Sequence, residues 1–217
     1  MNLSTPDHLT VVDHLLTTTR SVRKRLDFDR PVPSAIIERC LAIATQAPSG
    51  SNRQGWHFLV ITDPAKRQAL GELYRRSFDI YNRERSAPAD AAAQTQQRRL
   101  IDSASYLSQN MGRAPVLILP CISGKAENAG AQAGLWGSIL PAAWSLMLAL
   151  RARGLGSAWT TLHLRYEAEA AQLLGIPDTV SQAALLPVAW FKGDDFKPAS
   201  RVPARQVTYW DSWGETR

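Results

Sequence analysis

The chain has 217 residues, enough for one large domain with a full hydrophobic core and too few for two comfortable ones. Hydrophobic residues make up 45% and charged residues 20%, which excludes a disordered or fibrous chain. The formal net charge is +6, but the basic residues form short local groups without a known nucleic-acid-binding motif. They therefore favour sites for small anions, and a nucleic-acid-binding protein is the alternative that this charge leaves open.

Three features of the sequence bear on location and redox state. Residues Met1–Asp7 contain no basic segment followed by an apolar stretch, so we expect no secretory signal and a cytoplasmic protein. Cys40 and Cys121 lack CxxC or Cys–His spacing, which predicts two buried free thiols and no metal site. Residues 128–150 carry no charge, but only Ile139–Leu150 is strongly apolar, short of the roughly 20 residues that cross a bilayer. This segment predicts a core or subunit-interface helix, and no membrane partner is expected.

The N-terminal half predicts three helices and one strand. Thr5 and Pro6 are typical of a helix start, with threonine as the N-cap and proline at the first helical position. Ser34 is placed to cap a second helix. The expected order is a first helix through Leu16, a helix from Ser34 that stops before Pro48, a loop over Pro48–Gly55, a strand over His57–Ile61, and a third helix opened by Asp63 and Pro64 through Leu73.

The C-terminal half alternates strands and helices after an Ala-, Gln- and Arg-rich segment, residues 83–99, which is the candidate lid. The expected elements are a strand over Val116–Cys121, the apolar helix ending at Gly154–Gly156, a strand over Ser157–Leu162, a helix over Tyr166–Leu174 closed by Gly175, and a strand over Gln182–Phe191. Such alternation predicts an α/β or α+β sheet with helices on its faces. No GxGxxG, P-loop, HExxH or GxSxG motif is present, so an enzyme of this kind would take its reactivity from a cofactor.

Three short motifs follow one another along the chain: Arg20-Ser21-Val22-Arg23, Ala47–Trp56, and Gly154–Ser157 followed by a short strand and an arginine-containing tail. Each is weak alone, but their order and spacing resemble the FMN-dependent nitroreductase-like flavoproteins over almost the whole chain. The resemblance implies an α+β fold, an α/β sandwich with a mixed central sheet flanked by helices, in a single FMN-binding domain over residues 1–217. It also implies an intertwined homodimer with flavins at the subunit interface, in which the aromatic tail, residues 192–217, packs on the partner subunit.

The first motif offers cations to an anionic cofactor, although the run alone is equally consistent with a solvated helix end. Guanidinium groups bind phosphate bidentately, which makes Arg20 a candidate for the FMN phosphate. The resemblance places Arg23 at the N1 and C2 carbonyl edge of the flavin, where a fixed cation stabilises the reduced form. Ser21 would add a hydroxyl or backbone contact. Thr19 stands where the family usually has a second basic residue, a departure that bears on the phosphate contact.

The second motif is rich in ordinary turn residues, so a helix-terminating loop is its simpler interpretation. A flavin would use the same residues: Gly50 permits close approach of the backbone to a planar ring, and Asn52 offers a donor and an acceptor to the pyrimidine edge. The resemblance places Pro48, Ser49, Asn52 and Gln54 against the flavin.

The third motif and the tail complete the implied site. The resemblance places Trp159, Thr160 and Thr161 beside the isoalloxazine, where a backbone N–H can bond N5, the atom that accepts hydride. The flavin would then be the reactive centre, with no catalytic acid or base from the protein. In the tail, the resemblance makes Lys197 and Arg201 phosphate ligands; solvated tail charges are the alternative.

The function implied by the resemblance is an NAD(P)H-dependent oxidoreductase with ping-pong kinetics. Hydride would pass from NADH or NADPH to N5 of FMN, and electrons would then pass to a small-molecule acceptor such as a nitroaromatic or a quinone. Two alternatives are a flavin-sequestering storage protein with little turnover and a specialised reduced-flavin enzyme that fragments the flavin or removes halogens.

Overall fold

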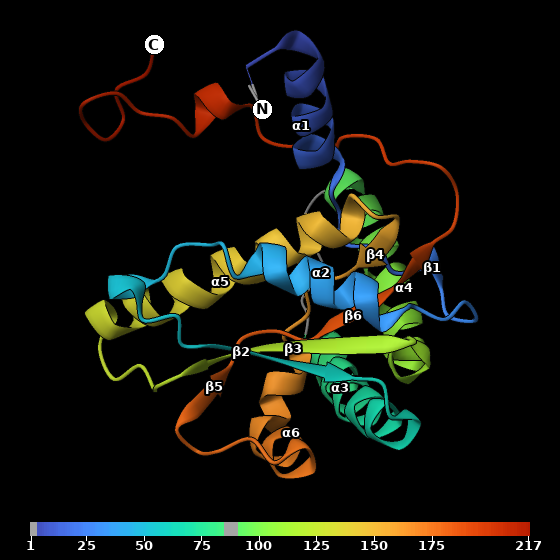
Figure 1. Cartoon of the computed structure of the whole chain (residues 1–217). Helices are drawn as coiled ribbons and strands as arrows, with labels where there is room; N and C mark the ends of the chain where they lie inside the picture. The colour runs from blue at the N-terminus through green and yellow to red at the C-terminus, as the bar shows by residue number, and fades with distance from the viewer. Residues whose placement is uncertain (1–3, 85–90) are drawn as a thin grey trace. The chain divides into compact units, whose positions relative to one another are not determined.

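The computed structural model describes residues 4–84 and 91–217, which form two compact units (Figure 1). The larger unit is Arg20–Gly193, and the smaller one combines Met1–Thr19 with Asp194–Arg217. Within the described part of the larger unit, six strands form one sheet: β1 (Leu26–Asp27), β2 (Trp56–Ile61), β3 (Val116–Ser123), β4 (Leu155–Ser157), β5 (Val180–Gln182) and β6 (Leu186–Phe191).

The sheet is built around β3, whose continuous apolar sequence is buried from Val116 to Ile122. The strand order is β1-β6-β3-β2, with β4 paired to β6 and β5 paired to β3. The ladders between these strands are antiparallel, and an isolated parallel bridge joins Ser21 to Ser157. The predicted mixed sheet is therefore confirmed.

Helices cover both faces of this sheet, as predicted (Figure 1). One face carries α2 and α5, and the other carries α3 and α6. The larger unit contains α2 (Ser34–Ala44), α3 (Pro64–Glu84), α4 (Ala91–Asn110), α5 (Ala129–Arg151) and α6 (Glu167–Leu174), with short 3-10 helices η1 (Gly50–Asn52), η2 (Met111–Arg113) and η3 (Leu162–Tyr166). The fold is α+β.

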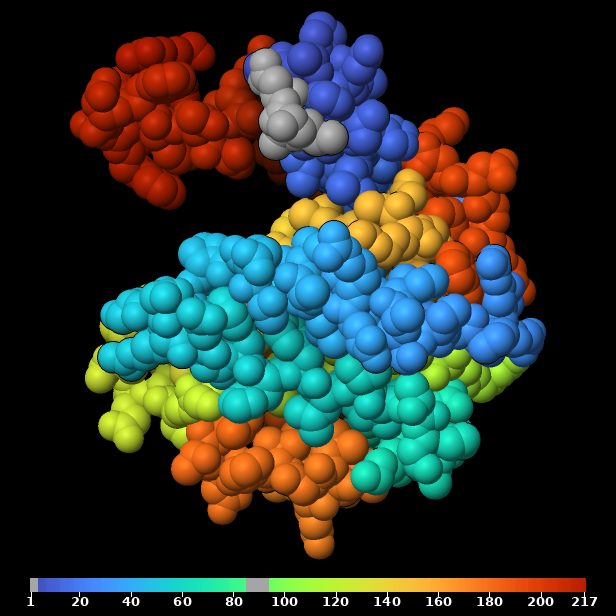
Figure 2. Space-filling model, in the orientation of Figure 1, coloured from blue at the N-terminus to red at the C-terminus, as the bar shows by residue number. Residues whose placement is uncertain are grey.

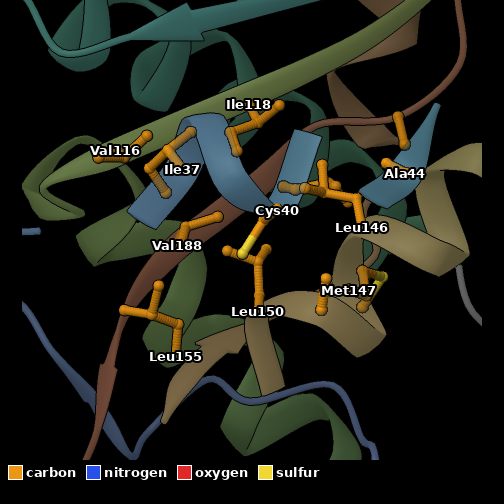
Figure 3. Packing of buried hydrophobic residues seen from close by; sticks show 13 residues of the cluster. Ile37, Cys40, Ala44, Val116, Ile118, Leu146, Met147, Leu150, Leu155 and Val188 are labelled. Carbon is orange, nitrogen blue, oxygen red and sulfur yellow. The ribbon is translucent and has the colours of Figure 1, made fainter. Parts of the chain in front are cut away.

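The main core lies between the sheet, α2 and α5 (Figure 3). Ile37 and Cys40 of α2 gather with Leu146 and Leu150 of α5 and with Ile118 of β3, and all five are at most 2% exposed. Full burial of one such aliphatic side chain contributes about 1.5–3 kcal/mol, so this cluster fixes α2 on α5. Both cysteines are free and buried, as the sequence predicted.

Helix α5, whose one charged residue is the final Arg151, is the helix among the described residues that is long and apolar enough to cross a membrane, with a mean hydropathy of 1.5 over 18 residues. In the structure it is a core helix, and Ile139, Leu146 and Leu150 are completely buried. Asn128 caps its start by accepting a hydrogen bond from the backbone N–H of Ala131 at 3.0 Å. The predicted buried helix is confirmed, and its other side leaves Trp144 40% exposed.

Three predicted boundaries were wrong. Pro33 occupies the N-cap position of α2, and Ser34 is its first helical residue, without a side-chain cap. The strand expected over Ser157–Leu162 ends at Ser157, because the chain enters the sheet directly after Gly154, whose φ of +78° ends the preceding turn. The strand expected over Gln182–Phe191 is two strands, since the register along β3 shifts by one residue between β5 and β6, as at a β-bulge.

The smaller unit contains α1 (Pro6–Thr18), η4 (Ala204–Gln206) and the tail. His14 Nε2 lies 2.7 Å from Asp195 Oδ2, which ties α1 to the start of the tail. The rings of Tyr209 and Trp213 pack at 4.7 Å between centroids, yet Trp213 is 90% exposed. Packing of this tail on a partner subunit stays a prediction. The candidate lid falls partly on residues 85–90, which lie outside the described residues.

Candidate functional site

A pocket of about 240 Å³ lies between the first motif, α3, α4 and the segment after β4. Arg23 enters it from one side and Trp159–Leu162 from another. Tyr74, Phe78 and Tyr81 of α3 line it from a single helix face, as their spacing of four and three residues requires. We call this the Arg23 pocket. It brings together two motifs that stand more than 130 residues apart in the sequence.

Arg23 is the charged side chain in the lining of this pocket. The backbone N–H of the preceding residue, Val22, donates to the carbonyl of Ser157 at 2.8 Å, so the motif is fixed to β4. Nε of Arg23 is buried and has no hydrogen-bond partner within the described part of the chain. An unpaired buried donor on a charged group costs free energy, and a ligand with acceptor atoms in this pocket would remove that cost.

The polar groups around Arg23 are neutral donors. Burial raises the pKa of Tyr74 to about 12, while the Arg23 charge opposes this rise in part, so the phenol is protonated at neutral pH. Thr160 is buried, and its hydroxyl donates to the carbonyl of Leu185 while its own carbonyl accepts from Leu185 N. Its side chain therefore serves the scaffold, which leaves the exposed hydroxyl of Thr161 available to a ligand.

The three α3 residues that line the Arg23 pocket were missed by the sequence analysis. Tyr74, Phe78 and Tyr81 carry no motif, and their helical spacing was the available signal. The same α3 region packs against η3, where His163 is completely buried and neither ring nitrogen has a partner among the residues described. Burial lowers the pKa of His163 to about 4, so its imidazole is neutral at neutral pH.

A second pocket, of about 410 Å³, lies beside the second motif. Its lining includes Ser49, Gly50 and Ser51 from the loop, residues of the end of β3, and Ser138 from α5. We call it the loop pocket. Figure 2 shows α2 and the chain that follows it at the surface of the larger unit.

The loop has an unusual backbone, because Ser51, Asn52 and Gln54 each have φ of +52°. Non-glycine residues rarely adopt this left-handed conformation, and they persist in it where surrounding contacts determine it. Here the backbone N–H of Gln54 donates to Ser49 Oγ at 3.0 Å, and the Gln54 amide donates to Asn52 Oδ1 at 3.1 Å. The backbone N–H of Gly50 donates to Ser138 Oγ of α5 at 2.9 Å. The loop is thus held in one shape from within and by α5.

Comparison with known proteins identifies the family. A sequence model of the nitroreductase family matches residues 16–190. The chain belongs to the nitroreductase family. It is 28% identical over 208 residues to an NADH dehydrogenase of Thermus thermophilus, covering 88% of this chain and 91% of that protein. It is also 28% identical over 180 residues to iodotyrosine deiodinase 1 of Rattus norvegicus, covering 81% of this chain but only 60% of that protein.

The fold comparison agrees with this assignment. The structure of an FMN- and NADPH-dependent nitroreductase from Sphigopyxis sp. strain HMH matches with a TM-score of 0.68 at 23% identity, covering 93% of this chain and 99% of that one. The family and the fold predicted from the three motifs are therefore confirmed.

The predicted site residues of this nitroreductase-family protein fall into separate groups. Arg23 lies with Trp159, Thr160 and Thr161 in the Arg23 pocket, whereas Ser49 and Gly50 line the loop pocket, and the two linings share no residue. The remaining residues of the prediction were assigned by the family pattern and line neither pocket: Arg20, Ser21, Pro48, Asn52, Gln54, Lys197 and Arg201. Lys197 and Arg201 belong to the smaller unit, and their role as phosphate ligands stays a prediction.

Proposed function

We propose that this protein is an FMN-dependent oxidoreductase that passes electrons from NADH or NADPH to a small-molecule acceptor such as a nitroaromatic or a quinone. The observation that carries the proposal is the half-buried Arg23, whose Nε has no partner in the described part of the chain while its side chain lines a pocket. The family assignment and the NADH dehydrogenase relative support the same chemistry.

The residues present fit FMN. The Arg23 guanidinium can hydrogen-bond the electron-rich edge of a flavin, and the aromatic face of α3 offers flat apolar surface to a planar ring. Arg20 is proposed to bind the phosphate, and Ser21 to add a hydroxyl or backbone contact. For Lys197 and Arg201 of the tail, the proposed role is that of phosphate ligands. In the loop, Asn52 and Gln54 are proposed to bond the ring edge, with Ser49 and Pro48 against the ring.

Bound FMN would supply the redox chemistry, accepting hydride at N5 and releasing electrons to the acceptor. The contribution of the chain is binding, orientation and electrostatics. Arg23 places a fixed positive charge beside the pocket, which favours a ligand that gains negative charge. Tyr74 stays protonated and neutral, so it adds no opposing charge. The protein therefore needs no titrating side chain for this chemistry.

We propose that the working form is a homodimer in which each flavin lies between subunits. One observation supports this: the Arg23 pocket and the loop pocket share no lining residue. A site assembled from the Arg23 pocket of one subunit and the loop of the other would use both motifs. The proposed setting is the cytoplasm, with no membrane or nucleic-acid partner.

An absorption spectrum tests the proposal directly. We expect the purified protein, supplied with FMN and desalted, to retain flavin absorbance that bleaches under anaerobic NADH or NADPH and returns on addition of a quinone. Retained flavin that no nicotinamide reduces would point to a flavin-sequestering protein. A colourless protein that binds DNA in a salt-sensitive manner would refute the proposal altogether.

One observation favours a second candidate, reductive dehalogenation. The chain is 28% identical to rat iodotyrosine deiodinase 1 over 81% of its length. The Arg23 pocket argues against this candidate: its described lining contains no acidic side chain that could bind the ammonium group of an amino acid substrate such as iodotyrosine. Incubation of the reduced protein with iodotyrosine separates the candidates, because released iodide would establish dehalogenation.

A further inference from the structure

The loop pocket has a charge that the proposed flavin contacts do not use. Two cationic side chains, Arg53 and Lys125, line it, and its lining contains no aspartate or glutamate. Serine hydroxyls complete the polar surface. Those of Ser49 and Ser51 can donate to a ligand, whereas Ser138 Oγ already donates to the carbonyl of Gly134 at 2.7 Å and Ser123 Oγ is bonded to His57 Nε2 at 2.8 Å. A pocket with this lining suits an anion that accepts several hydrogen bonds.

Of the two cationic side chains, Arg53 makes fewer polar contacts within the described residues. It is exposed, and its guanidinium has neither a hydrogen-bond nor an ion-pair partner among the described residues, whereas its backbone N–H donates to the carbonyl of Gly50 at 3.1 Å. It stands between Asn52 and Gln54, both in the left-handed conformation, so its backbone is fixed by the contacts that hold the loop. Lys125 is more engaged: its Nζ donates to the carbonyl of Val180 at 2.8 Å and lies 3.9 Å from Glu167 Oε1.

The size and the position of the loop pocket indicate which class of ligand it can bind. Its volume of about 410 Å³ is within the range of small-molecule sites, about 300–1,000 Å³. Ser49 belongs both to this pocket and to the set proposed to contact the flavin. A molecule that reaches the flavin at the loop can therefore extend into the pocket. The nicotinamide donors carry a pyrophosphate between their two nucleosides, and NADPH carries a further phosphate on the adenosine ribose.

We propose that the loop pocket binds the phosphate groups of the dinucleotide donor, with Arg53 as the principal contact and Lys125 as a second one. The inference rests on the proposed function, since it presumes that NADH or NADPH reacts at a flavin beside the loop. Arginine is suited to this role because its guanidinium donates two parallel hydrogen bonds to one phosphate. The pyrophosphate is common to both donors, and the 2′-phosphate is present in NADPH alone.

Calorimetry of the oxidised coenzymes on FMN-loaded protein gives the first test. Loss of a hydrogen bond between charged groups lowers affinity by about tenfold or more, so we expect Arg53→Gln to weaken NADP⁺ binding by that factor. Weaker binding of NADP⁺ alone would assign Arg53 to the 2′-phosphate, and equal weakening of NADP⁺ and NAD⁺ would assign it to the pyrophosphate. Arg39→Gln, an exposed arginine of α2 outside the pocket, is the matched control and should change neither.

Reduction kinetics give the second test. Arg53→Gln should raise the KM for NADPH or NADH by a similar factor, but leave the reduction rate with 1-benzyl-1,4-dihydronicotinamide, which has no phosphate, within about twofold. An equal loss with the phosphate-free donor would show damage to the flavin site and overturn the inference, as would unchanged coenzyme affinity. If Arg53→Gln does not fold, Lys125→Gln replaces it, with a smaller expected loss.

The two tests also separate this inference from the proposed function. A wild-type protein that retains no FMN, or whose FMN no donor reduces, refutes the proposed function. A wild-type protein whose FMN is reduced equally well by NADPH and by the phosphate-free donor keeps the proposed function and overturns the phosphate site.

Discussion

Individual polar side chains buried without partners are concentrated around α3 and the segments packed against it. Nε of Arg23, Oγ of Ser77 and both ring nitrogens of His163 have no hydrogen-bond partner among the described residues. Each such group costs about 1–3 kcal/mol of folding free energy. Arg23 differs from Ser77 and His163 because it lines the Arg23 pocket, so a bound ligand can supply the missing acceptor.

Replacement of Arg23 tests its proposed contact with FMN. Arg23→Ala should weaken FMN retention by about tenfold or more and lower the flavin reduction potential, because the cation that stabilises the reduced form is lost. Equilibrium dialysis measures retention, and anaerobic titration with a redox dye measures the potential. Arg39→Ala, also in the larger unit but outside both pockets, should alter neither quantity. Unchanged values for Arg23→Ala would remove Arg23 from the site.

His163 gives a prediction about pH and stability. Burial lowers its pKa from 6.5 in the unfolded chain to about 4, so the unfolded state binds a proton more readily at acid pH. The free energy of unfolding should therefore be unaffected by His163 above pH 6.5. It should fall as the pH drops toward 4, by ~3 kcal/mol in all. Urea unfolding between pH 4.5 and 8 measures this loss.

Two variants isolate the contribution of this imidazole. His163→Phe fills the buried position without a titrating group and should flatten the acid limb of the stability curve, since no hydrogen bond of His163 is lost. His163→Leu, an apolar replacement of another shape at the same buried position, should flatten the acid limb in the same way. An acid limb that persists in His163→Phe would assign the loss to other groups.

For single residues, the chemical type of a site residue could be predicted from the sequence, but its burial and its hydrogen-bond partners could not. The first motif identified Arg23 because its spacing to Arg20 and Ser21 is a local property of the chain. The unpaired state of Arg23 Nε depends on α3 and on the segment after β4, which are distant in sequence. Tyr74 was missed for the same reason, since an aromatic residue on a helix is usually core.

At the scale of secondary-structure elements, the loop over Pro48–Gly55 is held in place by a hydrogen bond to helix α5. Ser138 of α5 connects them: its Oγ accepts from the backbone N–H of Gly50 at 2.9 Å. Its carbonyl accepts from the indole of Trp56, the first residue of β2, at 2.9 Å. The loop holds three non-glycine residues at positive φ, which costs about 1–3 kcal/mol each. Contacts such as that of Ser138 are what keep the loop in this conformation.

Ser138→Ala should therefore loosen the loop without touching the proposed flavin contacts. We expect FMN affinity to fall by about fivefold, the equivalent of one neutral hydrogen bond, and the induced circular dichroism of the bound flavin to decrease. Ser138→Thr retains the hydroxyl and should restore both, which a purely steric role would not predict. If the alanine and threonine variants bind FMN alike, the hydrogen bond to Gly50 does not position the loop.

The positions of helices and strands could be predicted where the apolar pattern of the local sequence determines them. The predictions failed where pairing between distant strands determines the boundaries. Helix α2 and strand β3 follow directly from apolar periodicity and run length. The boundary between β5 and β6 does not follow from the local sequence. Both strands pair with β3, and only a one-residue shift in the register of that pairing separates them. That shift occurs where Leu185 leaves the β3 ladder to pair with Thr160, a contact between residues 25 positions apart.

At the scale of the whole molecule, the order of the motifs predicted the family and the fold. It could not predict whether the residues of the proposed flavin site come from one chain or from two. The motifs give no information on which groups share a chain, since a residue contributed by a partner leaves the same sequence signal as one contributed in cis. The structure shows that the Arg23 pocket and the loop pocket have separate linings. A site shared between two subunits is the arrangement that would use both.

Subunit mixing tests this arrangement. Arg23→Ala and Asn52→Ala each damage every site of their own homodimer, but a heterodimer of a symmetric pair would hold one doubly damaged site and one intact site. Random pairing of coexpressed chains should then restore about a quarter of the wild-type number of tightly held flavins, and about half in heterodimers isolated with two affinity tags. Flavin absorbance per protein and NADPH-dependent quinone reduction give two independent measures. If both groups belonged to a site within one chain, each heterodimer would contain only damaged sites and mixing would restore nothing.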